Sequence, residues 1–374
     1  MRMRPPASAT NLRFAWIPCE KQDRTFSERS TTMDGSMKQL IFKTKGEVEL
    51  TEVPIPSYGD DGVLIKVAYA GICGSDVHGF TKGGRYGGIG DGSKFGHEFV
   101  GTIVEVGAKV KELAVGDRVW IDPTFSNTDP RFCCMAGGFG EYCGTYKAIK
   151  DETVFVIPDN VPLRSAALIE PFGVAVHTKN RGGVQATDNV LMWGAGPIGL
   201  MGWAAMRHQG VENIFIAEQM PERIEFARNL GADVFDNTEK SAIEYAGEKF
   251  GIASINSYER ANVDRYLDYV GLGALINEYM ENGRCNSTFA TLGLDSRPIT
   301  INPAEFMSKQ FTVTGSRAYA PEDIKEVIEV LQDGAVDIAS IITSEFTLDQ
   351  AMEAFETACD KNKGMKVIFR MNGE

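Results

Sequence analysis

The chain has 374 residues, room for two domains with separate cores, and its apolar (43%) and charged (24%) fractions are ordinary for a soluble globular protein. Its net charge of −13 makes nucleic acid and anionic membrane surfaces poor partners. No apolar run approaches the roughly 18 residues that span a bilayer, so we expect no membrane partner and a small-molecule ligand.

Cysteine usage indicates the compartment. The seven cysteines are odd in number and irregularly spaced. Such a pattern in a long chain is typical of a reducing compartment and not of a disulfide framework. We therefore expect a cytoplasmic protein.

Residues 1–36 differ from the rest of the chain. They hold six basic and four acidic residues and show no strand or helix periodicity. No apolar stretch with a small-residue cleavage site follows the early arginines, so a secretory signal is not indicated, and the acidic residues count against a transit peptide. We expect a disordered extension, with Met33 or Met37 as the biological start.

From Met37 onward, short segments in which apolar and polar residues alternate predict strands. The expected strands are Gln39–Lys43, Glu47–Val53, Gly62–Ala70, Phe99–Val106, Arg118–Ile121 and Phe139–Tyr146. A loop rich in Pro, Asn, Asp and Gly occupies Asp122–Gly138. Short strands joined by turns favour a twisted, mostly antiparallel β domain.

The pattern changes after Pro162. Two helices are expected, Arg164–Ile169 and Gly173–Asn180, with Pro171 interrupting the chain between them. From Asn189 onward strands and helices alternate, which predicts a doubly wound parallel sheet of Rossmann type. The expected strands are Val190–Trp193, Asn213–Ala217, Val234–Phe235, Arg265–Tyr269, Phe289–Leu292 and Phe311–Thr314, and the expected helices are Gly199–Gln209 and Pro221–Leu230.

The tail returns to helix at Glu322–Gln332 and Leu348–Cys359 and ends in a strand at Lys366–Arg370. We therefore expect an α/β protein of two domains. Residues 37–185, completed by residues 317–374, would form the catalytic β domain. Residues 186–316 would form the Rossmann domain.

A glycine-rich turn between an apolar strand and a helix reads Gly194-Ala195-Gly196-Pro197-Ile198-Gly199. In this context the spacing G-x-G-x-x-G predicts a dinucleotide site, with the pyrophosphate on a helix N-terminus. Glu218 ends the next strand, nineteen residues after Gly199. A carboxylate there binds ribose hydroxyls and repels a 2′-phosphate, which favours NAD over NADP. Arg223 is close enough to tolerate a phosphate and complicates this choice.

Four residues form a mixed set of possible metal donors: Cys73, His97, Glu98 and Glu170. They lie in three motifs, Gly71-Ile72-Cys73-Gly74-Ser75-Asp76-Val77-His78, Gly96-His97-Glu98 and Leu168-Ile169-Glu170-Pro171. A thiolate, an imidazole and carboxylates are donors that zinc accepts. We predict that Cys73 and His97 hold zinc, that Glu98 or Glu170 supplies the third ligand, and that water or a substrate oxygen takes the open position. The alternative is that Cys73 is a small core residue and Glu170 an acid lining a cleft.

Zinc beside a nicotinamide indicates hydride transfer from a carbon whose oxygen the metal holds. The proton of that oxygen must then leave the site. Ser75 is placed to pass it on and His78 to release it to solvent, because histidine titrates near physiological pH. Asp76 is expected to orient a ligand and not to react.

With these motifs the chain resembles the zinc-dependent medium-chain alcohol dehydrogenases, most closely the branch of sorbitol, threonine and butanediol dehydrogenases. The resemblance runs from about Met37 to Arg370, and includes Gly116-Asp117-Arg118-Val119 and the tail Phe346–Phe355. It implies a GroES-like β domain, a secondary alcohol or polyol as substrate, and a homo-oligomer, dimer or tetramer. It also implies the relay through Ser75 and His78, and exchange between Glu98 and Glu170 as zinc ligand during turnover.

The expected contacts of the cofactor extend beyond the glycine-rich turn. Within the family resemblance, Arg317 matches a position that contacts both cofactor and polyol. The full set of expected cofactor-binding residues is Gly194, Gly196, Ile198, Gly199, Glu218, Arg223, Leu292, Gly293, Leu294, Ser316 and Arg317.

The chain departs from the family pattern in two places. Many members carry four closely spaced cysteines that bind a structural zinc, whereas the matching stretch here is shortened and has only Cys133 and Cys134. We therefore expect one zinc ion per chain. Polyol enzymes tend to have an aromatic residue after the relay histidine, but this chain has Gly79, and a glycine-rich loop at Thr81–Ser93 is expected to border the pocket.

Two alternatives to a zinc- and NAD-dependent dehydrogenase stay open from the sequence. One is a metal-free carbonyl or quinone reductase of the same superfamily that uses NADPH. The other is a catalytically silent member with a structural or regulatory role. The retained donor set and relay count against both.

Overall fold

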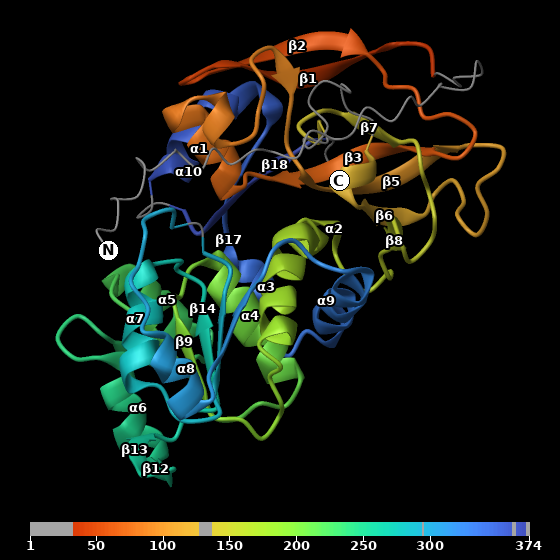
Figure 1. Ribbon diagram of the computed structural model, residues 1–374. Coiled ribbons are helices and arrows are strands. Elements are labelled where there is room, and N and C mark those ends of the chain that lie inside the picture. Colours follow the sequence, from red (N-terminus) through yellow and green to blue (C-terminus); the bar gives the residue numbers. More distant parts are fainter. Residues whose placement is uncertain (1–32, 127–136, 294, 361–363, 372–374) are drawn as a thin grey trace, which may run out of the picture.

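The computed structural model describes residues 33–126, 137–293, 295–360 and 364–371. Most of the expected disordered extension, the loop with Cys133 and Cys134, and Leu294 lie outside the described residues. The described chain has a β-rich part and an α/β part, the upper and lower halves of Figure 1. None of the described helices is long and apolar enough to cross a membrane.

The β-rich part contains two sheets. The smaller sheet has the order β2-β1-β4 and consists of β1 (Ser36–Thr44), β2 (Glu47–Pro54) and β4 (Ser93–Lys94). The larger sheet has the order β17-β18-β3-β5-β6-β8, with β7 paired to β3 off this path. Its strands are β3 (Val63–Gly71), β5 (Glu98–Val106), β6 (Arg118–Ile121), β7 (Tyr142–Thr145), β8 (Val154–Val156), β17 (Ile342–Phe346) and β18 (Lys366–Arg370). Only the β17–β18 pair is parallel, which confirms the mostly antiparallel prediction.

The α/β part is built on a six-stranded sheet in which every pair is parallel, in the order β11-β10-β9-β14-β15-β16. Its strands are β9 (Val190–Trp193), β10 (Ile214–Glu218), β11 (Val234–Asp236), β14 (Arg265–Asp268), β15 (Thr288–Thr291) and β16 (Thr312–Gly315). Its helices are α4 (Pro197–His208), α5 (Pro221–Asn229), α6 (Ala242–Phe250), α7 (Gly273–Asn282) and α8 (Pro303–Lys309). The strand order reverses between β9 and β14, and ligands of doubly wound sheets bind at such a switch point. The Rossmann prediction is confirmed.

Three helices join the two parts: α2 (Leu163–Ala166), α3 (Ile169–Arg181) and α9 (Pro321–Asp333). The expected break at Pro171 is wrong, because Pro171 lies in the first turn of α3. A proline is tolerated there, since the first amides of a helix have no intrahelical partner. The break comes earlier, between Ala166 and Ile169.

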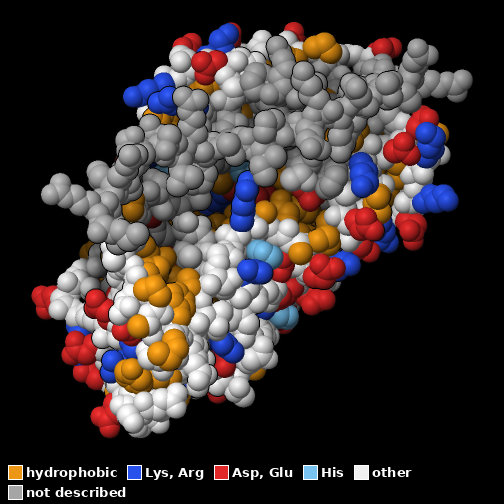
Figure 2. Space-filling model, in the orientation of Figure 1, with side chains coloured by type: hydrophobic (Ala, Val, Ile, Leu, Met, Phe, Trp, Pro, Cys, Tyr) orange, Lys and Arg blue, Asp and Glu red, His pale blue; other side chains and the backbone are white. Residues whose placement is uncertain are grey.

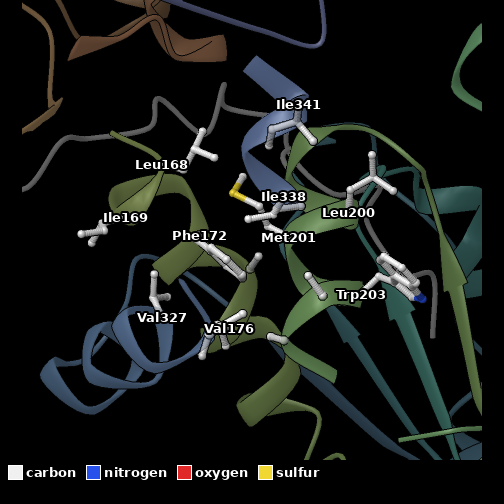
Figure 3. Close-up of a cluster of buried hydrophobic side chains, with 14 of the residues drawn as sticks. Leu168, Ile169, Phe172, Val176, Leu200, Met201, Trp203, Val327, Ile338 and Ile341 are labelled. Atoms are coloured by element: carbon white, nitrogen blue, oxygen red, sulfur yellow. The ribbon is translucent and has the colours of Figure 1, made fainter. Parts of the chain in front are cut away.

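Helix α3 packs at the centre of the largest apolar cluster. Figure 3 shows Phe172 and Val176 of α3 beside Met201 of α4 and Val327 of α9. The same cluster includes Val100 and Trp120 of the β-rich sheet. The two parts therefore share a continuous core, and α3 is held from several sides.

The C-terminal segment returns to the first sheet. β18 pairs with β3 next to the start of α1 (Gly74–Lys82), and α10 (Ala351–Cys359) packs against α1. The pairing of β18 with β3 agrees with the expected return of the tail to the β-rich part. The exact domain boundaries given from the sequence stay predictions.

Several elements were not foreseen from the sequence. They are the helices α1, α6, α7 and α8, the strands β4, β8 and β17, and the hairpin of β12 (Ile252–Ile255) and β13 (Tyr258–Ala261). Helix α1 has two glycines among nine residues, which lowers its intrinsic propensity. It forms because Asp76 caps it through the Cys73 amide (2.9 Å) and because Phe80 stacks on Phe355 of α10.

Candidate functional site

The ladder between β3 and β5 brings the first three donors together. Gly71, the last residue of β3, lies opposite Glu98, the first residue of β5. Cys73 follows two residues later as the N-cap of α1, and His97 precedes Glu98. One donor atom from each of Cys73, His97 and Glu98 lies within 4.8 Å of the others, a grouping that the sequence spacing did not guarantee.

Two glycines make room for this arrangement. Gly96 has φ = +90°, and a Cβ there would lie 2.6 Å from the ring of Phe139. A Cβ at Gly71 would lie 2.2 Å from Glu98 Oε2. The turn before His97 and the end of β3 opposite Glu98 therefore both require a residue without a side chain.

Glu170 approaches the cluster from α3, in the first helical turn. It lies outside the group of three, yet it interacts electrostatically with His97 and Glu98. Burial raises the pKa of Glu170 to about 7, and the negative charge of Glu98 adds to this effect. The structure thus places both predicted glutamates at the site, with Glu98 the one in direct reach of Cys73 and His97.

The imidazole of His97 lies between negative groups. Burial opposes its charged form, but Cys73, Asp76 and Glu170 together raise its pKa well above 6.5. Asp76 is fully buried, and burial raises its pKa to about 6. Its Oδ1 lies 3.9 Å from His97 Nδ1. Asp76 therefore lies beside the His97 ring without a hydrogen bond to it, while its other oxygen caps α1, and its role in orienting a ligand stays a prediction.

Sequence reasoning missed Lys366, at the start of β18. Its side chain is buried, donates to the Ile72 carbonyl (3.0 Å) and forms an ion pair with Glu98 Oε2. Burial opposes the charge of Lys366, but Glu98 and Cys73 outweigh this and raise its pKa. The only sequence signal was a lysine at the head of an apolar strand.

The donor set fits zinc. Ligands held about 2.0–2.3 Å from zinc lie within about 4.6 Å of one another, and the donor atoms of the three residues all lie within 4.8 Å of one another. His97 Nδ1 and Glu98 Oε1 are buried with no hydrogen-bond partner among the described residues. Buried polar atoms normally have a hydrogen-bond partner. These two atoms are therefore available to bind a metal ion or a molecule beside it.

The predicted relay residues lie on α1, next to the donors. Ser75 is partly buried and His78 is exposed, three positions further along the helix. Residues so spaced share a helix face. The relay through these two residues stays a prediction.

The glycine-rich turn lies between β9 and α4, at the switch point of the parallel sheet. Gly194 has φ = +98°, and a Cβ on Gly199 would lie 2.0 Å from the Gly194 carbonyl oxygen. Gly196 is the N-cap of α4, while Ile198 packs on the core. These features match the three roles of the glycines: a tight turn, an open approach and close packing of helix on strand.

Glu218 ends β10, with its carboxylate turned to backbone amides. It accepts hydrogen bonds from Ala195 (2.9 Å), Gln219 (2.7 Å) and Met220 (3.0 Å). The Arg223 guanidinium lies over Gly196, with Nη1 3.3 Å from the position of an added Cβ. Arg223 is thus placed beside the turn expected to hold the pyrophosphate.

The remaining predicted cofactor residues follow β15 and β16. Gly293 lies so close to Gly271 that a Cβ added to Gly293 would be 1.9 Å from the Cα of Gly271. Ser316 donates its amide to Thr291 (2.8 Å), and Arg317 is exposed. Leu292 is partly buried next to Gly293, and Leu294 lies outside the described residues. Leu292, Gly293, Ser316 and Arg317 thus all follow the carboxyl ends of β15 and β16.

Asp268 at the end of β14 was also missed. Its Oδ1 accepts from the amides of Val270 (2.9 Å) and Gly271 (2.7 Å), and its Oδ2 accepts from Thr291 Oγ1 (2.8 Å). The carboxylate therefore ties the ends of β14 and β15 together, next to the glycine-rich turn. The sequence signal that could have indicated Asp268 is an aspartate at the end of a buried strand.

On the face shown in Figure 2, acidic and basic side chains are interspersed, and apolar side chains gather over α7 and α8. The exposed apolar residues of this region are Val270, Leu272 and Met307. This surface lies in the α/β part.

Comparison with known proteins agrees with both parts of the fold. Residues 59–159 match the model of the alcohol dehydrogenase GroES-like domain, and residues 197–333 match that of the zinc-binding dehydrogenases. A sorbitol dehydrogenase of Bacillus subtilis is 31% identical over 363 residues, which cover 91% of this chain and 99% of that protein. A probable D-xylulose reductase A of Aspergillus terreus is 30% identical over 355 residues, with 89% and 98% covered.

Solved structures agree as well. An alcohol dehydrogenase of Escherichia coli, crystallised with NADH, superimposes with a TM-score of 0.78 at 26% identity, covering 90% of this chain and all of that one. The likeness therefore extends over both the β-rich part and the α/β part of the chain. The chain belongs to the zinc-binding, medium-chain alcohol dehydrogenases, in the sorbitol dehydrogenase-like branch.

Proposed function

We propose that the protein is a zinc- and NAD-dependent dehydrogenase that moves a hydride between NAD and a secondary alcohol or polyol. The observation that carries the proposal is the Cys73–His97–Glu98 cluster, whose donor atoms lie within 4.8 Å. The named relatives act on sorbitol and D-xylulose, which are polyhydroxylated compounds. A metal-free reductase would have no use for three converging donors.

In this proposal Cys73, His97 and Glu98 hold the zinc ion, and Glu170 takes the place of Glu98 during part of the cycle. When bound, zinc would act as a Lewis acid towards the substrate oxygen and make its proton more acidic. In the exchange of Glu98 for Glu170, the ion pair with Lys366 would hold Glu98 when it is not bound to zinc. Burial raises the pKa of Glu170, so its negative charge needs a positive partner at this position.

The chain's own residues would handle proton and cofactor. Ser75 receives the proton of the substrate hydroxyl, and exposed His78 delivers it to solvent. The α4 N-terminus, opened by Gly196, binds the pyrophosphate, and Glu218 binds the ribose hydroxyls. On binding the cofactor, Glu218 would replace some of its hydrogen bonds from backbone amides by hydrogen bonds from the ribose hydroxyls.

The test is NADH formation, followed at 340 nm, on a panel of secondary alcohols and polyols with NAD or NADP as oxidant. We expect turnover with NAD, loss of turnover after removal of metal, and recovery with zinc. Cys73→Ala should be inactive but folded, whereas Cys359→Ala, a partly buried thiol on α10, should be active. Turnover that survives complete removal of metal would contradict the proposal.

The homo-oligomer and the cytoplasmic location stay predictions from the sequence. Light scattering coupled to size exclusion tests the first. We expect a dimer or tetramer, and a monomeric mass at micromolar concentration would contradict it.

A further inference from the structure

Glu170 lies in the first turn of α3, so the position of this helix decides where its carboxylate lies. The N-cap residue of the helix is Leu168, an apolar side chain that cannot cap it with a hydrogen bond. The first half of α3 is held by apolar packing, to which Ile169, Phe172 and Val176 contribute (Figure 3). Apolar attraction has no preferred direction, so contacts of another kind are needed to fix α3 along and about its axis.

The second half of α3 supplies those contacts. Five consecutive residues, which we call the α3 anchor, each form a side-chain hydrogen bond with another element. The pairs are His177 with Asp323 (2.7 Å), Thr178 with Ser316 (3.1 Å), Lys179 with Gln209 (2.8 Å), Asn180 with Asp323 (2.7 Å) and Arg181 with Thr314 (2.8 Å). Consecutive helix residues are about 100° apart around the axis. These bonds therefore leave α3 in different directions and oppose both rotation and sliding.

Asp323 is the centre of the α3 anchor. It lies in the first turn of α9 and is 4% exposed. Its Oδ1 accepts from Asn180, and its Oδ2 accepts from the Ala320 amide (2.7 Å) and bonds His177 Nδ1. A carboxylate only accepts hydrogen bonds, so Nδ1 of His177 is the donor. The buried carboxylate thus ties α3 to the start of α9.

The α3 anchor and Glu170 belong to one stiff element. His177 follows Glu170 by seven residues, about two helical turns and about 10.5 Å along the axis, and so lies on the same face. A shift of α3 at the anchor moves Glu170 relative to Cys73, His97 and Glu98, which lie in the β-rich part. Metal–ligand distances vary by only about 0.2 Å, so even a small shift would weaken a bond from Glu170 to a metal ion.

We propose that Asp323 and His177 are positioning residues, whose hydrogen bond fixes α3 so that the Glu170 carboxylate can reach the metal ion. This inference rests on the proposed function, and in particular on Glu170 taking the place of Glu98 as a zinc ligand. The His177–Asp323 bond then supports metal binding through Glu170 and contributes nothing to metal binding through Glu98. Neither residue touches the metal ion or the substrate.

The test measures zinc affinity, by competition with a chelator, in two backgrounds that separate the two glutamates. In Glu98→Gln the third ligand is Glu170, and in Glu170→Gln it is Glu98. His177→Phe removes one donor to Asp323 but leaves the bonds from Asn180 and Ala320, so we expect the fold to hold. It should weaken zinc binding about tenfold in the Glu98→Gln background, a loss typical of a group that orients a metal ligand. In the Glu170→Gln background it should leave zinc affinity unchanged.

Two further variants serve as controls in the Glu98→Gln background. His177→Asn keeps a nitrogen donor on Cγ, where Nδ1 stood, and should restore most of the lost affinity. His208→Phe removes a similar bond, because His208 Nδ1 of α4 lies 3.0 Å from Asp333 Oδ2 of α9, and it should have no effect on zinc. In the otherwise wild-type protein, His177→Phe should lower kcat and leave KM for NAD unchanged, since the displaced group is a metal ligand and not part of the cofactor site.

Each result decides the question. Equal losses of zinc affinity in both backgrounds would show that the α3 anchor only supports the fold. No loss in either background, or no recovery with His177→Asn, would show that the His177–Asp323 bond does not position Glu170. A Glu98→Gln protein that binds no zinc would also overturn the inference, because Glu170 would then not replace Glu98. If the wild-type protein binds zinc but oxidises no alcohol with NAD, the proposed function fails, and the affinity comparison still decides the inference.

Discussion

The ion pair between Lys366 and Glu98 predicts a large effect from a single substitution, Lys366→Met. Glu98 is 1% exposed and Lys366 is 6% exposed, so neither side chain is solvated. Methionine keeps much of the volume of the lysine stem but leaves the carboxylate buried without its partner. Removing one member of a buried pair typically costs about 3–5 kcal/mol.

A second argument sets an upper limit on this cost. A stranded carboxylate escapes by taking up a proton, and at pH 7 neutralising an ordinary glutamate that titrates near pH 4.3 costs about 3.7 kcal/mol. The loss for Lys366→Met should therefore be about 3–4 kcal/mol at pH 7. At pH 5 the same step costs only about 1 kcal/mol, so the loss should shrink accordingly.

The assay is urea unfolding of metal-free protein at both pH values, because a bound ion would supply the missing positive charge. Lys366→Met/Glu98→Gln should recover most of the loss, since an amide replaces the stranded charge. Lys325→Met, an exposed lysine on α9, serves as the control and should stay within about 0.5 kcal/mol of wild type. A loss below about 1 kcal/mol at pH 7, or no recovery in the double variant, would refute the reasoning.

Four further predictions concern metal, cofactor, proton transfer and pH. Elemental analysis should find about one zinc per chain, and almost none in Cys73→Ala; two per chain would show that the loop with Cys133 and Cys134 binds metal. Glu218→Ala should lower the NAD-to-NADP ratio of kcat/KM at least tenfold, and a wild-type protein that uses NADP as well as NAD would contradict the role of this carboxylate. His78→Gln should slow oxidation most at or below neutral pH, with partial rescue by imidazole and unchanged zinc content; an unaltered pH profile would remove His78 from the relay. Burial raises the pKa of Asp76 from 3.8 to about 6 and of Glu170 from 4.5 to about 7, so the folded metal-free protein holds these protons more tightly than the unfolded chain, and its melting temperature should fall as the pH rises from about 4 through about 7. Zinc should raise the melting temperature more at pH 7.5 than at pH 5.5, because it binds deprotonated ligands, and a zinc effect independent of pH would contradict this account.

The sequence by itself determined the local chemistry and the order of the elements. Alternation of apolar residues predicted β3 and β5, and an apolar strand before G-x-G-x-x-G predicted the turn from β9 into α4. These are short-range properties, because the side-chain period and the conformational freedom of glycine act over a few residues. Cys73, His97 and Glu170 were found in the same way, as donors in short motifs.

Local rules also failed at particular places. Pro171 was expected to interrupt a helix but lies in the first turn of α3, where its missing amide costs nothing. Helix α1 has a weak propensity of its own and depends on its Asp76 cap and on packing against α10. In both cases the decisive factor was the position within the element or its neighbours in space, and not the residue type.

Only the tertiary structure decided which charges and rings meet across the chain. Lys366 lies 268 positions after Glu98 and reaches it because β18 pairs with β3. Tyr319 lies against Gly173 and Trp120 because the segment after β16 returns to α3 and β6. Such contacts depend on strand order and helix packing, which arise from burying apolar surface over the whole chain. A buried charge such as that of Glu98 needs a partner of opposite charge. Because this partner is far away in the sequence, the ion pair could not be deduced from any local segment.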